Sequence, residues 1–85
     1  MVNVDAMVAM PTDCYISKTS DYYCLDKQGR KVWKHRSKKH PYYLVWDELH
    51  GEIEVFYQKT LLHRAVYHPN GDYKSGAVKG RELHL

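Results

Sequence analysis

Two strand-like segments on either side of a short turn constrain the fold of this chain more than any other feature. Residues 42–47 (Tyr-Tyr-Leu-Val-Trp-Asp) are rich in aromatic and β-branched side chains, which is typical of strands. In residues 52–57 (Glu-Ile-Glu-Val-Phe-Tyr), the two-residue period of a strand would place Glu52, Glu54 and Phe56 on one face. Residues 48–51 end in glycine, which suits a reversal of the chain. The sequence therefore predicts a β-hairpin over residues 42–57.

Further segments predict a mainly antiparallel sheet around this hairpin. The additional strands are expected at residues 21–25, 30–36, 61–67 and 81–85, with turns at 26–29 and 68–71. At the N-terminus, residues 2–10 predict a short helix or a strand that ends before Pro11. The predicted fold is mainly β (α+β): a single small domain with a highly twisted antiparallel sheet of about five strands and a short N-terminal helix.

Length and cysteine content narrow the class of protein. The chain has 85 residues, so we expect one domain over residues 1–85 with a limited core. No apolar run approaches the length of a membrane span, and the N-terminus lacks the basic start and long apolar stretch of a signal peptide. Two cysteines, Cys14 and Cys24, are too few for a disulfide scaffold, and without a Cys-x-x-Cys pair they do not indicate a structural zinc site.

Charge is divided unevenly along a chain whose formal net charge is +3. Residues 30–39 hold six cations and no acid, whereas residues 40–56 hold four acids and neither lysine nor arginine. A dense basic run that contains a tryptophan favours contact with a nucleic-acid backbone. The candidate RNA-binding residues are Arg30, Lys31, Lys34, Arg36, Lys38 and Lys39. The alternative is a solvated, lysine-rich sheet edge that deters aggregation.

The acidic run contains groups that can transfer protons. If the hairpin forms, it brings Asp47, His50, Glu52 and Glu54 to one end of the sheet. Nearby carboxylates raise the pKa of a histidine and favour imidazolium. A carboxylate base and a histidine acid are what cleavage of RNA by its own 2′-hydroxyl requires, together with a cation that stabilises the charge on phosphorus. Two alternatives remain: the same four side chains bind a divalent metal, or they form a solvated hairpin tip.

The spacing Trp46-Asp47-x-x-His50-Gly51-Glu52-x-Glu54 resembles the core motif of the cytotoxic ribonuclease domain of the ribosome-inactivating colicins and cloacin. Later family features include a histidine, an aromatic-x-Pro turn with glycine, a Lys-Gly step and a late arginine. Similar places are occupied here by His63, Tyr67-His68-Pro69-Asn70-Gly71, Lys74-Ser75-Gly76 and Arg81. The family-like core spans residues 42–85. Residues 1–23 do not align, and the basic run resembles the family only in composition.

The resemblance implies a toxin that cuts small-subunit ribosomal RNA at the decoding site, without metal or another cofactor, and so stops translation. It implies Glu54 as general base, His50 as general acid, Asp47 as the group that orients His50, Arg81 as the cation for the phosphorane, Glu52 as a further acidic position and Lys74 as a phosphate contact. Phe56 stands where the family has a tyrosine, which removes one hydroxyl from this region.

The family also implies partners and a place of action. Such a domain would be the C-terminal tail of a larger toxin and would act in the cytoplasm of a competing bacterium. Its producer would be protected by an acidic immunity protein bound through charge complementarity. The alternative functions are a toxin that cuts another RNA such as tRNA, a non-catalytic RNA- or ribosome-binding module, and a metal-dependent nuclease.

Three further residues are also considered as candidates for the site. Trp33 and Trp46 are candidates for stacking on bases, although Trp46 lies within an apolar strand and is expected in the core. For His63 we expect an ordinary hydrogen bond within a strand, in preference to a place beside the reacting groups.

Overall fold

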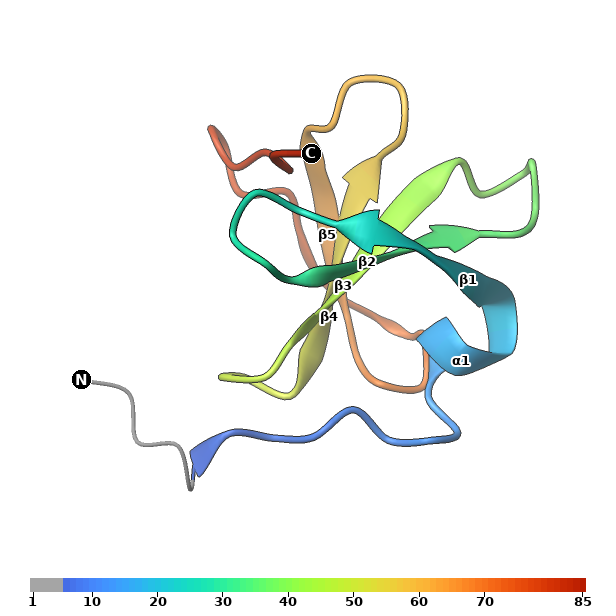
Figure 1. The fold of residues 1–85 in the computed structure, drawn as a ribbon, viewed down its shortest axis with the longest axis vertical. Helices are drawn as coiled ribbons and strands as arrows, with labels where there is room; N and C mark the ends of the chain where they lie inside the picture. The colour runs from blue at the N-terminus through green and yellow to red at the C-terminus, as the bar shows by residue number, and fades with distance from the viewer. Residues whose placement is uncertain (1–5) are drawn as a thin grey trace.

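Six antiparallel strands form one sheet in the computed structural model, which describes residues 6–85 (Figure 1). In spatial and chain order they are β1 (Ser20–Leu25), β2 (Lys31–His35), β3 (Tyr42–Asp47), β4 (Glu52–Tyr57), β5 (His63–Tyr67) and β6 (Tyr73–Gly76). One short helix, α1 (Tyr15–Thr19), precedes the sheet. The prediction of a mainly β domain with an antiparallel sheet and a short N-terminal helix is confirmed, with six strands in place of about five.

Two local predictions were wrong, and one strand was missed. The helix occupies Tyr15–Thr19, whereas residues 7–10 form neither helix nor strand and residues 2–5 lie outside the described residues. Residues 7–10 instead dock on the β3–β4 turn, where the Val8 N–H donates to the Glu48 carbonyl at 2.7 Å. The sequence did not predict β6. The strand expected over residues 81–85 is reduced to a single bridge between Leu62 and Glu82.

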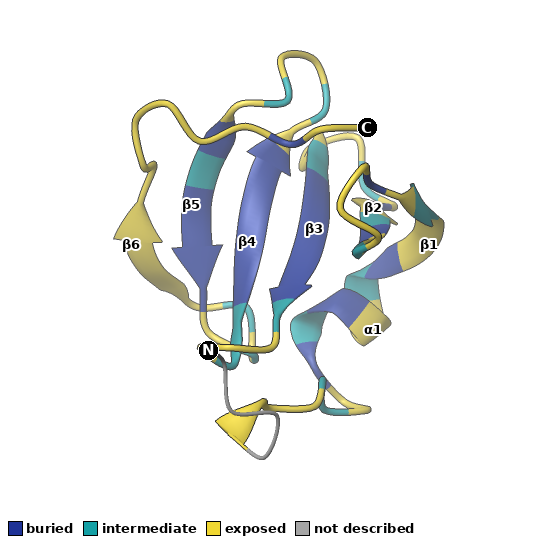
Figure 2. Ribbon diagram, turned by 60° about the vertical axis from the view of Figure 1, so that its left-hand side comes forward, coloured by how far each residue is buried: buried dark blue, intermediate teal, exposed yellow. Residues whose placement is uncertain are grey.

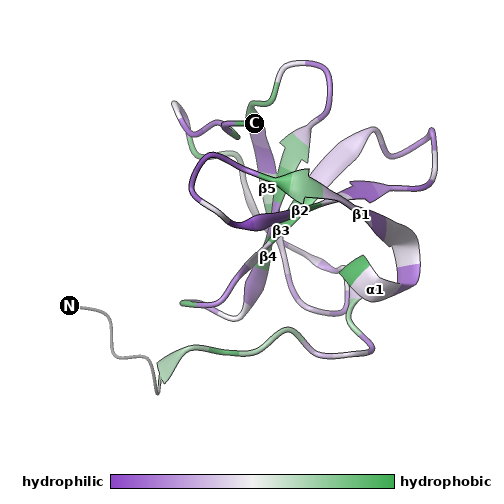
Figure 3. Cartoon of the chain, viewed as in Figure 1, coloured by the Kyte–Doolittle hydropathy of each residue, from purple (hydrophilic) through white to green (hydrophobic). Residues whose placement is uncertain are grey.

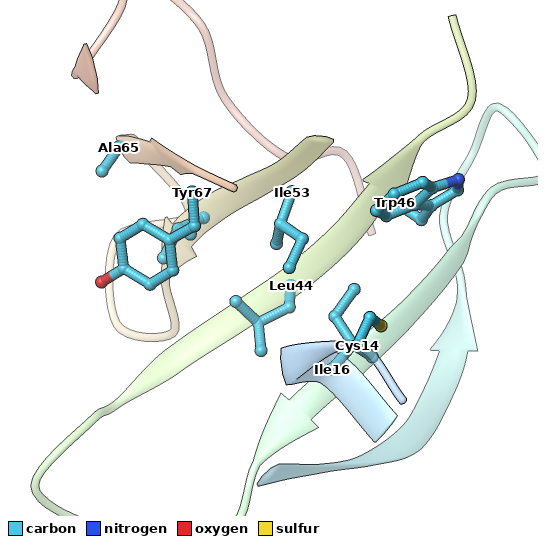
Figure 4. Close-up of a cluster of buried hydrophobic side chains, with 8 residues drawn as sticks. Cys14, Ile16, Leu44, Trp46, Ile53, Ala65 and Tyr67 are labelled. Atoms are coloured by element: carbon cyan, nitrogen blue, oxygen red, sulfur yellow. The ribbon is translucent and has the colours of Figure 1, made fainter. Parts of the chain in front are cut away.

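Each face of the sheet is covered by a different part of the chain. One face carries Leu44, Ile53 and Val55, and α1 covers it by inserting Ile16 (Figure 4). The opposite face, here called the cleft face, carries Val32, Tyr43, Val45, Phe56 and Leu83, the last from the C-terminal segment of residues 81–85. Because β3, β4 and β5 are covered on both sides, they are the most buried strands, whereas β6 is exposed (Figure 2).

The N-terminal segment before α1 is largely apolar. The N-terminal segment just after the grey trace is coloured hydrophobic in Figure 3, and in it Met7 and Val8 are exposed while Met10 packs against the α1 side of the sheet. Within residues 6–85, no helix has the length and apolar character needed to cross a membrane.

Gly71 fixes the position of α1 against the β5–β6 turn. Its φ is +95°, and a Cβ at this position would lie 2.3 Å from Tyr15 Cδ1. Tyr15 cannot easily yield, because its N–H donates to the Pro69 carbonyl at 2.7 Å and its hydroxyl is bonded to His35 Nε2 at 3.0 Å. We expect Gly71→Ala to lower the free energy of unfolding by about 2–4 kcal/mol in urea denaturation.

Gly29→Ala is the matched control for that variant. Gly29 also has a positive φ, +80°, but nothing lies within 4 Å of a Cβ built there. The free energy of unfolding of Gly29→Ala should fall only by the backbone cost of about 1–2 kcal/mol. Equal losses in the two variants would show that the Tyr15 contact does not restrict residue 71.

Candidate active site

The β3–β4 hairpin places three of the acidic side chains on the cleft face. Asp47 pairs directly with Glu52, and Val45 pairs with Glu54, so Asp47, Glu52 and Glu54 share that face as the two-residue period predicted. The turn between the strands closes with a hydrogen bond from the Gly51 N–H to the Asp47 carbonyl at 2.8 Å. Gly51 has a φ of +63°, which glycine adopts without the cost of a side chain.

Asp47 holds both the turn and His50. Its Oδ1 accepts the N–H groups of Leu49 and His50, at 3.0 and 3.2 Å. Its Oδ2 lies 2.8 Å from His50 Nδ1. Since a carboxylate can only accept, the proton of this bond belongs to Nδ1. The other ring nitrogen, Nε2, stays available to a substrate in the cleft. The hydrogen bond to Asp47, followed by the charges of Asp47 and Glu52, raises the pKa of His50 above its ordinary value.

Asp47→Asn tests this control of His50. Without the carboxylate charge, the pKa of His50 should fall toward the ordinary value of about 6.5. An NMR titration of the His50 ring protons would measure the shift directly. Glu48→Gln is the control, because it removes one carboxylate from the same exposed turn and should move the His50 titration much less. An unchanged titration in Asp47→Asn would contradict the assigned hydrogen bond.

Glu54 is buried and is contacted from two sides. Arg81 Nη1 donates to Glu54 Oε1 at 2.8 Å, and His63 Nε2 lies 2.5 Å from Oε2. The Val78 N–H donates to His63 Nδ1 at 2.8 Å, so Nδ1 carries a lone pair and the ring proton lies on Nε2, facing Glu54. Glu54 Oε2 and His63 Nε2 are the only buried side-chain N or O atoms of residues 6–85 that otherwise lack a hydrogen-bond partner. We therefore assign them to each other.

A β-bulge brings His63 to this position. Val55 pairs with Ala65, but the next residue of β4, Phe56, pairs with His63, so one residue of β5 is skipped. The shift turns His63 toward the cleft face, where its ring packs edge-on against Phe56 with 5.3 Å between centroids. The expectation of an ordinary strand histidine was therefore incomplete. The one sequence signal for His63 was its match to a histidine downstream of the resembling motif.

The C-terminal segment carries Arg81 across the cleft face. The His63 N–H donates to the Arg81 carbonyl at 3.0 Å, and the Leu83 N–H donates to the Leu61 carbonyl at 2.8 Å. Beyond these bonds, the Lys27 N–H donates to the His84 carbonyl at 2.8 Å. The result is an open cleft of about 410 Å³ beside Glu54. It is lined by Gln28, Arg30, Asp47, Leu49, His50, Glu54, Phe56, Arg81, Glu82 and His84.

Glu52 lies outside the lining of the cleft and is ion-paired with Lys74. The donor atoms of Asp47, His50 and Glu52 all lie within 4.8 Å of one another, a spacing that a divalent cation could use. Glu54 is not part of this group. In the structure, Glu52 is instead paired with Lys74, and His50 Nδ1 is hydrogen-bonded to Asp47 Oδ2, so a metal would compete with these two contacts.

The six candidate cations of residues 30–39 differ in how free they are to contact RNA. Arg36 is occupied within the fold, donating to Asp21 Oδ1 at 2.8 Å and to the Lys18 carbonyl at 2.6 Å. Arg30 Nε donates to Asp26 Oδ2 at 2.8 Å, yet Arg30 also lines the cleft. Lys34 lies over the ring of Tyr23, 5.7 Å from its centroid. The others, Lys31, Lys38 and Lys39, are exposed and form no ion pair within residues 6–85.

One cleft thus collects a buried carboxylate, a histidine with a raised pKa and an arginine. Of the five predicted catalytic residues, Asp47, His50, Glu54 and Arg81 line it, and Glu52 lies next to Asp47 on the neighbouring strand. Such a set can accept a proton, donate a proton and stabilise negative charge in one place. Neither a protein-family model nor a curated protein matches this chain.

Proposed function

We propose that this chain is a metal-independent endoribonuclease that cleaves RNA through its own 2′-hydroxyl. The observation that carries the proposal is the placement of buried Glu54 against Arg81 in the same cleft as His50. An acid, a base and a cation are the groups that this reaction needs. The resemblance of the Trp46 to Glu54 motif to the colicin and cloacin ribonucleases supports the same reaction.

In the proposed reaction, Glu54 and His50 each transfer one proton. Glu54 takes the proton of the 2′-hydroxyl as the 2′-oxygen forms a bond to the adjacent phosphorus. The bond from phosphorus to the 5′-oxygen then breaks, and His50 gives its Nε2 proton to that oxygen. The products are a 2′,3′-cyclic phosphate and a free 5′-hydroxyl. DNA is not cleaved, because it lacks the attacking hydroxyl.

Arg81 and His63 prepare Glu54 for its role. The guanidinium has five N–H donors, so Arg81 can keep Nη1 on Glu54 and use the remaining donors for the phosphoryl oxygens. As negative charge grows on the phosphorus centre, those free donors can stabilise it while Nη1 keeps Glu54 in position. The Nε2–H group of His63 donates a hydrogen bond to Glu54 and so positions the carboxylate. His63 is not the general acid, since losing that proton would leave an imidazolate.

The biological target follows from the resemblance and from charge. We propose small-subunit ribosomal RNA at the decoding site as the substrate, and exposed Lys31, Lys38 and Lys39 as contacts to its backbone. The domain would reach the cytoplasm of a competing bacterium as the C-terminal tail of a larger toxin. An acidic immunity protein would cover the positively charged chain in the producer.

Two incubations test the proposed reaction: one with intact ribosomes in the magnesium buffer that they require, and one with a short decoding-site RNA in EDTA. We expect one discrete fragment of small-subunit RNA whose new end is a 2′,3′-cyclic phosphate. Loss of cleavage in EDTA, with recovery on adding Mg²⁺ or Mn²⁺, would favour the metal group of Asp47, His50 and Glu52. Binding without cleavage, where a known ribosomal ribonuclease cuts, would favour a binding module. Cleavage of purified tRNA with ribosomes left intact would change the substrate but keep the chemistry.

A further inference from the structure

A second depression adjoins the cleft, on the other side of the β3–β4 turn. Its volume is about 660 Å³, within the range of ordinary ligand sites. It lies between the N-terminal segment of residues 7–10, the start of β2 and the end of β3. We call it the tryptophan groove, and its lining residues that matter here are Ala9, Met10, Arg30, Lys31, Trp33 and Trp46.

The tryptophan groove is continuous with the candidate active site. Arg30, Asp47 and Leu49 line both depressions. A chain with its reacting phosphate beside Glu54 would therefore meet Arg30 at the boundary. Asp26 orients Arg30 by accepting its backbone N–H and, from the guanidinium, the Nε–H. The other four N–H donors of the guanidinium remain for a phosphate.

Both tryptophans of the chain line this groove. Trp46 forms the floor of the groove: it is buried in the core, 8% exposed, and its Nε1–H donates to the Val8 carbonyl at 2.8 Å. Trp33 is half-buried and packs on the α1 side of the sheet, and it therefore presents the more accessible ring. Aromatic side chains beside cations are the usual elements of a site for an unpaired nucleobase, where the base stacks and the cation binds its phosphate.

We propose that the tryptophan groove holds an unpaired base of the RNA substrate, next to the nucleotide cleaved in the active-site cleft. This inference rests on the proposed function for its choice of RNA as occupant. The groove lining holds two cations, Arg30 and Lys31, and two acids of the β3–β4 turn, Asp47 and Glu48. The choice of RNA as occupant therefore rests on the continuity of the groove with the cleft at Arg30 and on exposed Lys31 at the rim. The groove would restrict cleavage to RNA whose neighbouring base is free of pairing.

Tryptophan fluorescence tests the groove without any cleavage, because Trp33 and Trp46 are the only tryptophans in the chain. The probes are (dA)6 and an abasic hexanucleotide of the same charge, and neither has a 2′-hydroxyl. We expect (dA)6 to quench the emission and to bind at least about fivefold more tightly than the abasic strand at low salt. Equal affinities of the two strands would overturn the proposal.

A matched pair of variants locates the effect. Ala9→Glu places a carboxylate in the groove, whereas Ala6→Glu adds the same charge on the same exposed segment outside the groove lining. Ala9→Glu should bind (dA)6 and the abasic strand with about equal affinity, whereas Ala6→Glu should still bind (dA)6 more tightly. Equal behaviour of the two variants would overturn the groove assignment. The assignment would also be overturned if an uncharged pentapeptide of Met and Val changed the tryptophan emission and (dA)6 did not.

The two proposals fail separately. Base-dependent quenching in a protein that never cleaves ribosomes or tRNA would refute the nuclease and leave the base site in place. Cleavage without base-dependent quenching would refute the base site alone.

Discussion

Glu54→Gln is expected to lower the rate of RNA cleavage by about 10²–10⁴-fold while leaving RNA affinity nearly unchanged. Glutamine has almost the same shape as glutamate, but its amide does not accept a proton from the 2′-hydroxyl at neutral pH. The measurement is single-turnover cleavage of ribosomes with protein in excess, which separates the chemical step from binding. The affinity is measured in parallel with an uncleavable DNA strand.

The variant should also be somewhat less stable. Glu54 presents one oxygen to Arg81 and the other to His63, whereas glutamine has a single oxygen for two donors. One buried donor then loses its acceptor, at a cost of about 1–3 kcal/mol. Urea denaturation of Glu54→Gln therefore accompanies the assay, so that loss of activity is not mistaken for unfolding.

Glu52→Gln is the comparison that identifies the base. It makes the same chemical change on the same face of β4, two residues earlier, and breaks the ion pair with Lys74. Because Glu52 does not line the cleft, we expect its rate of cleavage to fall far less than that of Glu54→Gln. A loss in Glu52→Gln equal to that in Glu54→Gln would mean that the base is wrongly assigned.

The hairpin at the centre of the fold was predictable from local chemistry. The predicted strands at residues 42–47 and 52–57 have the bounds of β3 and β4, because aromatic and β-branched residues flank a turn that ends in glycine. β6 was not predictable in this way. Apart from Tyr73, its residues (Lys-Ser-Gly) have little strand preference, and their extended shape comes from pairing with β5.

The active site was predictable only where it is local in sequence. The bond between Asp47 and His50 spans three residues of one turn, and Glu54 follows by strand alternation. His63 needed the β-bulge in β5, which no residue preference signals. The role of Arg36 as a clamp between α1 and the sheet also depends on contacts between distant segments. Its place in a basic run favoured a nucleic-acid contact instead.

Arg81→Ala is expected to reduce the rate of cleavage by about 10²–10³-fold, because it removes the donor aimed at the charge that develops on phosphorus. The same change takes away the partner of Glu54 Oε1. Arg81→Lys retains the charge but loses the planar fork of donors, and we expect an intermediate rate. Single-turnover cleavage measures the rates of both variants.

The control for Arg81 is Lys79→Ala, which removes one exposed positive charge two residues earlier in the same loop. Its rate should stay close to that of the unchanged protein, since Lys79 does not line the cleft. Arg30 is the other arginine of the cleft, and its Nε is bound to Asp26. If Arg81→Ala cleaves normally and Arg30→Ala does not, the charge of the transition state is held from the β1–β2 turn and not from the C-terminal segment. If both variants lose activity to the same extent, cleavage depends on both arginines of the cleft.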